Sequence, residues 1–119
     1  MTINRHPAGD VMVLDVGGRL TSDESEQALI AAVRGAVEQG FANILLNMVG
    51  VAQIDSVGLT ELVRARSLAE SHGGQLKLEH AGADVRLLLR LTRVDALLPM
   101  FEDEEQALAA FAATATRAA

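Results

Sequence analysis

Residues 53–62 read QIDSVGLTEL, and they join an apolar run to a segment with helical spacing. Asp55 and Ser56 stand side by side in this stretch, and Gly58 follows them. A serine or aspartate in such a place is typical of a helix cap, because its side-chain oxygen accepts a hydrogen bond from a free amide of the first turn. The order of strand pattern, short loop and helix predicts an α/β fold, with these residues at the carboxyl end of a strand.

The rest of the chain alternates between strand and helix patterns. In the first long apolar run, Gly17 and Gly18 indicate a turn or a bulge. The run NILLNMV lies between polar or glycine positions and is typical of a strand buried on both faces. Alternation in QLKLEH predicts a strand with one solvated side, on which Lys77 and Glu79 would lie. Strands are therefore predicted at residues 2–6, 11–20, 43–49 and 75–80.

Apolar residues at helical spacing predict helices near residues 21–39, 57–72, 84–91 and 103–112. Thr21 and Glu24 have the spacing of a capping box for the first helix. In the second helix Glu61 falls in the polar set, away from the apolar face. Asp84 is placed to cap the third, and the acidic residues from Asp103 onward favour the positive end of the last.

These elements predict one α/β domain: a mixed, mostly parallel β-sheet of four to five strands covered by about four helices. A chain of 119 residues, half of them apolar, can build one core and has no room for two ordinary domains. We assign residues 1–112 to the domain and residues 113–119 to a frayed tail.

Charge and composition exclude several classes of function. A net charge of −6 and scattered basic residues oppose nucleic acid as a partner. The absence of cysteine removes thiolate chemistry and zinc ribbons, and no metal or cofactor motif is found. No run of apolar residues is long enough to insert directly into a membrane, and the first ten residues lack the apolar core of a signal peptide. The expected location is the cytoplasm.

Three readings treat residues 55–56 as more than a cap. A hydrolase would use Ser56 as nucleophile, but Ile54 stands where the first glycine of the G-x-S-x-G elbow belongs. The histidines that follow it, His72 and His80, each have an ordinary structural explanation. A receiver domain would phosphorylate Asp55, yet the single lysine, Lys77, begins a strand in the wrong place. The third reading is phosphorylation of Ser56 itself, where the amides of a helix N-terminus could hold the phosphate.

A resemblance to a known family bears on this choice. The segments GGRL followed by Thr21, then NILLNMVGVAQIDSVGL, then HGGQLKL resemble the STAS domain, in particular the bacterial anti-sigma factor antagonists. The resemblance covers residues 11–111, and the IDSVGL block is its most specific part. It implies that the domain is not an enzyme and that Ser56 is the phosphorylated serine of a partner-switching regulator of transcription.

The resemblance also implies partners and contact residues. The unphosphorylated form would bind an anti-sigma factor with serine kinase activity and release a sigma factor, and phosphorylation would switch binding off until a PP2C-type phosphatase reset it. Two positions depart from the family pattern, because Thr21 replaces an aspartate and Val57 replaces a small hydroxyl residue. Val57 either faces the sheet or belongs to an apolar patch shown to the partner; we favour the patch. The contact residues implied by the resemblance are Thr21, Asn47, Asp55, Ser56, Val57, Gly58 and Thr60.

The departure at Thr21 leaves an alternative open. A STAS domain that does not switch could serve as an accessory subunit of a lipid-transport or other membrane complex. Direct nucleotide binding has less support, because Gly17 and Gly18 lack the rest of a phosphate-binding loop.

Overall fold

The structure, a computed structural model, describes residues 1–23 and 27–118, and side chains are described as far as residue 113. In these ranges the chain forms a five-stranded sheet with four α-helices and one short 3-10 helix, as the sequence predicts. The strands are β1 (Thr2–Ala8), β2 (Val11–Leu20), β3 (Asn43–Ile54), β4 (Leu76–Glu79) and β5 (Met100–Phe101). The helices are α1 (Ala28–Glu38), α2 (Ser56–Ser71), α3 (Ala83–Leu91), the 3-10 helix η1 (Val94–Ala96) and α4 (Glu104–Ala118).

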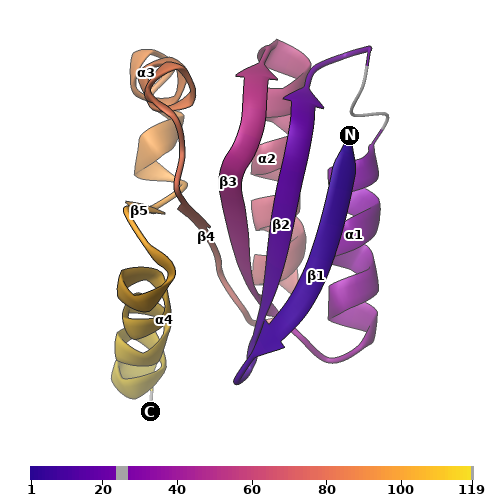
Figure 1. Cartoon of the computed structure of the whole chain (residues 1–119). Coiled ribbons are helices and arrows are strands. Elements are labelled where there is room, and N and C mark those ends of the chain that lie inside the picture. Colours follow the sequence, from indigo (N-terminus) through magenta and orange to yellow (C-terminus); the bar gives the residue numbers. More distant parts are fainter. Residues whose placement is uncertain (24–26, 119) are drawn as a thin grey trace.

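The strands lie in sequence order, and only β1 is antiparallel to its neighbour. The remaining pairs are parallel and require crossover connections, which the helices supply (Figure 1). Every second residue of a strand points to the same face. Met12, Leu14, Leu46 and Met48 therefore face α1 and α2 in the main core, whereas Val13 and Leu45 face α4 in a smaller cluster with Phe111.

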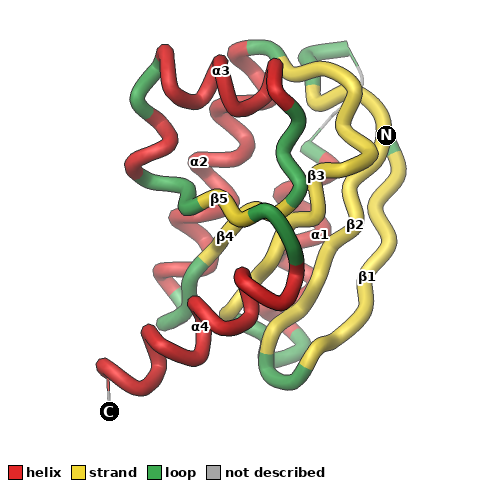
Figure 2. Tube along the Cα trace, turned by 60° about the vertical axis from the view of Figure 1, so that its left-hand side comes forward, coloured by secondary structure: helices red, strands yellow, loops and turns green. Residues whose placement is uncertain are grey.

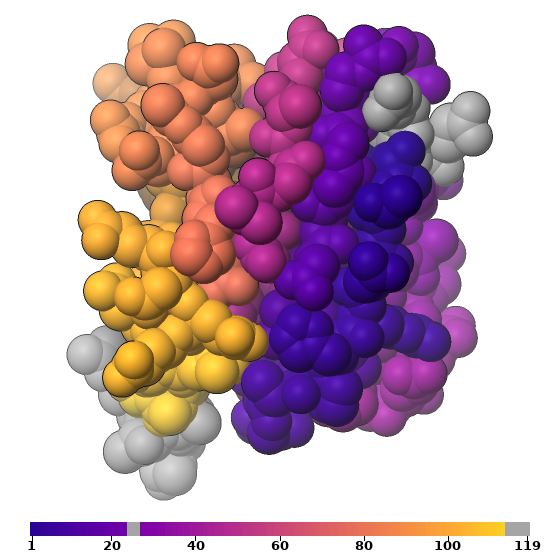
Figure 3. Space-filling view, viewed as in Figure 1, coloured from indigo at the N-terminus to yellow at the C-terminus, as the bar shows by residue number. Residues whose placement is uncertain are grey.

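The two faces are covered to different extents. Helices α1 and α2 lie side by side behind the sheet in Figure 1, and α4 lies toward the edge formed by β4 and β5 (Figures 1 and 2). The space-filling view shows side chains of β1 and β2 open beside α4 on the front face (Figure 3). This partial cover leaves polar side chains in the middle of the sheet partly accessible.

Two strand predictions need correction. Strand β3 continues to Ile54 instead of ending at residue 49, because it stays paired with β2 as far as Leu20, through an irregular register beyond Gly50. The sequence predicts a turn or bulge at Gly17 and Gly18; the β2–β3 register does shift there, but the extra residues lie on β3. The predicted solvated side of β4 is wrong, since α4 covers that face and buries both Lys77 and Glu79. The Lys77 ammonium lies 5.0 Å from the centre of the Phe111 ring and donates to Gln75 Oε1 at 2.7 Å.

Three helix boundaries also differ from the sequence prediction. Helix α1 begins at Ala28, and Thr21 does not cap it; the predicted partner Glu24 lies outside the described residues. Helix α3 begins after Gly82, so Asp84 lies in its first turn without capping it. Helix α4 runs to Ala118 instead of ending at residue 112, and Asp103 Oδ1 accepts a hydrogen bond from the amide of Gln106 at its start.

Candidate functional site

The site forms where β3 ends and α2 begins. Ser56 is the first residue of α2 and is exposed. The cap is Asp55, whose Oδ1 accepts hydrogen bonds from the amides of Val57 and Gly58 at 2.9 and 3.0 Å. The hydroxyl of Ser56 is therefore not needed to cap the helix. The same bonds correct one sequence-based expectation, because two amides that could receive a phosphate on Ser56 are already occupied by Asp55.

Gly58 lets α2 approach the end of β2 closely. A Cβ atom at this position would lie 1.9 Å from the carbonyl oxygen of Leu20 and 2.8 Å from its carbonyl carbon, both backbone atoms. The amide of Asp55 donates to the same carbonyl oxygen at 3.3 Å. The glycine thus fixes how close the first turn of α2 stands to the loop after β2.

The loop after β2 adds a second acid beside the first. The amide of Ser22 donates to Asp55 Oδ2 at 2.9 Å, so both carboxylate oxygens of Asp55 are engaged. The hydroxyl of Thr21 donates to Asp23, which also forms an ion pair with Arg19 at 3.5 Å. Thr21 itself is buried and holds Asp23 at the rim of the site.

Hydrogen bonds lower the pKa of both acids. The amides of Ser22, Gly58 and Val57 hold the pKa of Asp55 below its usual value. The hydroxyl of Thr21 and a backbone amide lower the pKa of Asp23 in the same way. Sequence reasoning missed Asp23. The signal that could have found it is an acid two residues after the threonine that replaces the family aspartate.

An open hollow of about 420 Å³ lies next to Ser56, between the start of α2 and the residues before α1. Ser56, Val57 and Thr60 line it and are exposed, and the hydroxyl of Thr60 donates to the carbonyl of Ser56 at 2.9 Å. Val57, 44% exposed, faces outward and not the sheet. Glu61 also lines the hollow, but it is buried, which contradicts its predicted place on the polar face.

Asn47 lies elsewhere. It occupies the face of the sheet opposite α2, where its amide nitrogen donates to Asp15 Oδ1 at 2.8 Å. It lies seven residues before Ile54 along an extended strand, roughly 20 Å at about 3.3 Å per residue. The structure therefore brings together Thr21, Asp55, Ser56, Val57, Gly58 and Thr60, and it places Asn47 apart from them.

The arrangement gives no support to hydrolytic chemistry at Ser56. His72 follows the last residue of the 16-residue helix α2, so the length of the helix, roughly 24 Å, separates it from Ser56. Its ring Nδ1 lies 3.0 Å from the carbonyl oxygen of Leu68. His80 lines a different hollow, and no histidine is among the described residues that line the one beside Ser56.

Residues 1–23 and 27–118 contain neither a metal-binding cluster nor a membrane-spanning helix. No group of three or more His, Cys, Asp or Glu side chains is placed to hold a metal ion. No helix in that part of the chain has the length and hydropathy to cross a membrane.

Comparison with known proteins identifies the family. The sequence profile of the STAS domain matches residues 2–107, which is most of the chain. The chain belongs to the STAS domain family. A comparison with curated protein sequences finds no match.

Solved structures of other proteins share the fold at low sequence identity. A Thermotoga maritima protein assigned as an anti-sigma factor antagonist is 21% identical, with a TM-score of 0.84 over 92% of this chain and 93% of that one. An anti-sigma factor antagonist from Mycobacterium paratuberculosis is 23% identical, with a TM-score of 0.80 over 92% of each chain. The phosphorylated form of the Bacillus cell fate determinant SpoIIAA is 19% identical, with a TM-score of 0.67 over 90% of this STAS domain and 96% of that chain.

Proposed function

We propose that this STAS domain is an anti-sigma factor antagonist whose binding is switched by phosphorylation of Ser56. The observation that carries the proposal is that Asp55 and Ser56 have different roles at the start of α2. Asp55 satisfies the helix amides, which leaves the Ser56 hydroxyl exposed and free for modification. The structural neighbours include anti-sigma factor antagonists, one of them in a phosphorylated form, which supports an anti-sigma factor as the partner.

Phosphorylation would change the binding of the partner and would leave the fold unchanged. A phosphate on Ser56 adds about two negative charges to a rim that already carries Asp23 and Asp55. Water can solvate these charges in the free domain, because Ser56 is exposed. A partner that covers the rim would have to remove that water, and burying unmatched charge costs several kcal/mol. Each 1.4 kcal/mol is a tenfold loss of affinity, so one phosphate suffices to release the partner.

The exposed residues beside Ser56 suit such a partner. Val57 offers apolar surface, and Thr60 follows Ser56 on the same side of the helix. Asp23 supplies a carboxylate on the loop where the family aspartate is replaced by Thr21. We propose that Asp23 contacts the partner in place of the family aspartate.

Binding of Ser56 variants to the candidate partners tests the proposal. The probes are the anti-sigma factor kinases encoded by the same organism, measured with wild type, Ser56→Ala and Ser56→Asp. We expect wild type and Ser56→Ala to bind alike and Ser56→Asp to lose at least tenfold in affinity. Ser67→Asp, at an exposed position of α2 outside the proposed contact residues, is the matched charge control and should bind like wild type. Equal binding by all four proteins would contradict the proposal.

The non-switching accessory subunit is the alternative. Retrieval from membranes in complex with a transport protein, at equal yield for wild type and Ser56→Asp, would favour it. Recovery of soluble regulators alone would count against it.

A further inference from the structure

The outer side of α3 carries two parallel rows of side chains. Arg86 and Arg90 form one row and Leu87 and Leu91 form the next, because residues four apart stack along a helix. The leucines are 52% and 74% exposed, although Val85 and Leu89 already provide the buried face of the helix. We call these four residues the α3 surface. Large apolar side chains left open in a cluster indicate a surface that another molecule covers.

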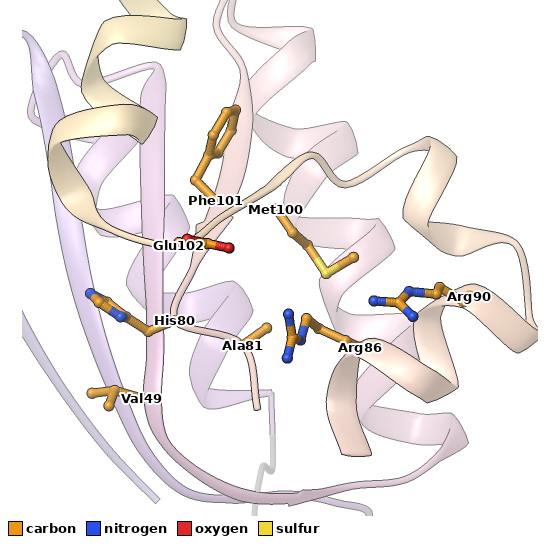
Figure 4. Close-up of a pocket in the computed structure, with 8 residues that line it drawn as sticks. All are labelled: Val49, His80, Ala81, Arg86, Arg90, Met100, Phe101 and Glu102. Carbon is orange, nitrogen blue, oxygen red and sulfur yellow. The ribbon is translucent and has the colours of Figure 1, made fainter. Parts of the chain in front are cut away.

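The arginine row borders a hollow of about 540 Å³ at the carboxyl ends of β4 and β5 (Figure 4). The guanidinium groups of Arg86 and Arg90 reach toward it from α3, and Glu102 extends toward it from the end of β5. Val49, which is 71% exposed, and Met100 supply apolar lining. The hollow thus combines both signs of charge with apolar walls.

The charges around this hollow are unpaired within the described part of one chain. No ion pair or hydrogen bond joins Arg86 or Arg90 to another side chain there, and none engages Glu102. Two like charges four residues apart on a helix repel each other. An external acid placed between the two guanidinium groups would remove this repulsion.

A second copy of the chain fits these features better than a purely acidic partner or a membrane. A two-fold axis makes the same patch face itself, so a contact between two different groups is made twice. Glu102 of each copy would then meet Arg86 and Arg90 of the other, and the two leucine rows would cover each other. A uniformly anionic surface would leave Glu102 without a cation, and a flat lipid surface would leave the hollow unfilled.

We propose that the chain forms a two-fold homodimer through the α3 surface, with Glu102 of each copy bound by Arg86 and Arg90 of the other. This interface lies on α3 and β5, apart from the residues around Ser56, and it does not depend on the phosphorylation switch. Arginine and exposed apolar side chains together are typical of the energetic centre of protein interfaces.

Charge reversal on either side of the contact tests the dimer. Sedimentation velocity at about 0.15 M salt, from about 5 to 500 μM protein, would compare wild type with Arg86→Glu/Arg90→Glu and with Glu102→Arg. Wild type is expected to shift from monomer to dimer across this range. Each variant should need at least a tenfold higher concentration than wild type to dimerise, because like charges then meet at both contacts.

Mixing the two variants makes the test specific. An equimolar mixture restores opposite charges at both contacts, so heterodimers should form at the concentrations where wild type dimerises. Arg93→Glu reverses an exposed arginine outside the hollow and should leave wild-type behaviour unchanged. A wild type that stays monomeric throughout, variants that still dimerise, or a mixture without recovery would each overturn the proposal, as would binding to anionic vesicles by a monomer.

Discussion

Asp55 and Glu79 are both acids at the carboxyl ends of parallel strands, yet the protein shifts their pKa values in opposite directions. Asp55 is partly exposed at the start of α2, and three backbone amides lower its pKa. Glu79 is 2% exposed under α4, and burial raises its pKa. Its Oε2 atom is buried with no hydrogen-bond partner, and Asp15 and Glu104 add negative charge nearby.

The difference shows that the surroundings of a carboxylate decide its role: Asp55 caps α2, and Glu79 is buried under α4. A carboxylate satisfied by amides is a fixed anion, so Asp55 can hold the start of α2 in place without the hydroxyl of Ser56. A carboxylate that lacks donors favours its protonated form, so Glu79 weakens the packing of α4 when it is ionised. The proposed phosphorylation site lies beside the acid that is satisfied.

The largest expected effect comes from changing the position of α2. Gly58→Ala would place a Cβ atom 1.9 Å from a backbone oxygen of Leu20, so α2 must move away from the loop that binds Asp55. We expect a loss of about 3 kcal/mol or more in the free energy of unfolding, measured by urea denaturation. Gly82→Ala, where the added atom meets nothing within 4 Å, is the control. Equal small losses in both would show that the close approach is unimportant.

The second effect removes the satisfied acid. Asp55→Ala takes away the acceptor for the amides of Ser22, Val57 and Gly58. We expect the melting temperature to fall by about 5 °C at pH 7. Because the pKa of Asp55 is lower in the folded state, its contribution is present above the ordinary value of 3.8 and is lost as the pH falls through the folded-state pKa. The difference between wild type and variant should therefore shrink only below about pH 4; a difference that already vanishes near pH 6 would contradict this assignment.

The third effect has the opposite sign. Glu79→Gln removes a buried charge, and we expect the melting temperature to rise by about 2–4 °C at pH 7–8. The folded-state pKa of Glu79 lies above its ordinary value of 4.5, so ionisation destabilises the fold at high pH. This penalty fades as the pH falls through the folded-state pKa, and the advantage of the variant should fade with it. A variant that melts below wild type at pH 8 would show that the charge has a partner.

The smallest effect concerns Asn47. Asn47→Ala removes the hydrogen bond to Asp15 and should cost about 1 kcal/mol of stability. Because Asn47 lies on the face opposite α2, we expect the affinity for an anti-sigma factor to change less than twofold. A tenfold loss of affinity without unfolding would instead support the contact that the family resemblance implies for this residue.

Most of the fold was predictable, because its signals are local. The order of elements followed from apolar periodicity and from glycines at element ends, and Gly17 and Gly18 marked a real irregularity in the β2–β3 pairing. Whether an alternating strand has a solvated side depends on what packs on it. Lys77 and Glu79 alternate with leucines as surface residues do, but α4, which begins more than 20 residues later, covers them.

The site was predictable in part for the same reason. The IDSVGL block named the residues that gather around the start of α2, but spacing could not decide which of Asp55 and Ser56 is the cap. Cap choice depends on backbone geometry, which lets Asp55 reach two amides of the helix and one of the loop after β2. Glu61 lies on the polar side by periodicity and yet is buried, and spacing along one helix cannot predict burial by other parts of the chain.

Intact-mass analysis during incubation with the cognate kinase and ATP tests the central claim most directly, with partner binding followed in the same samples. Wild type should gain a single phosphate, Ser56→Ala should gain none, and binding should fall in step with the phosphorylated fraction. A phosphate gained by Ser56→Ala, or binding that persists in fully phosphorylated wild type, would contradict the assignment of Ser56 as the switch.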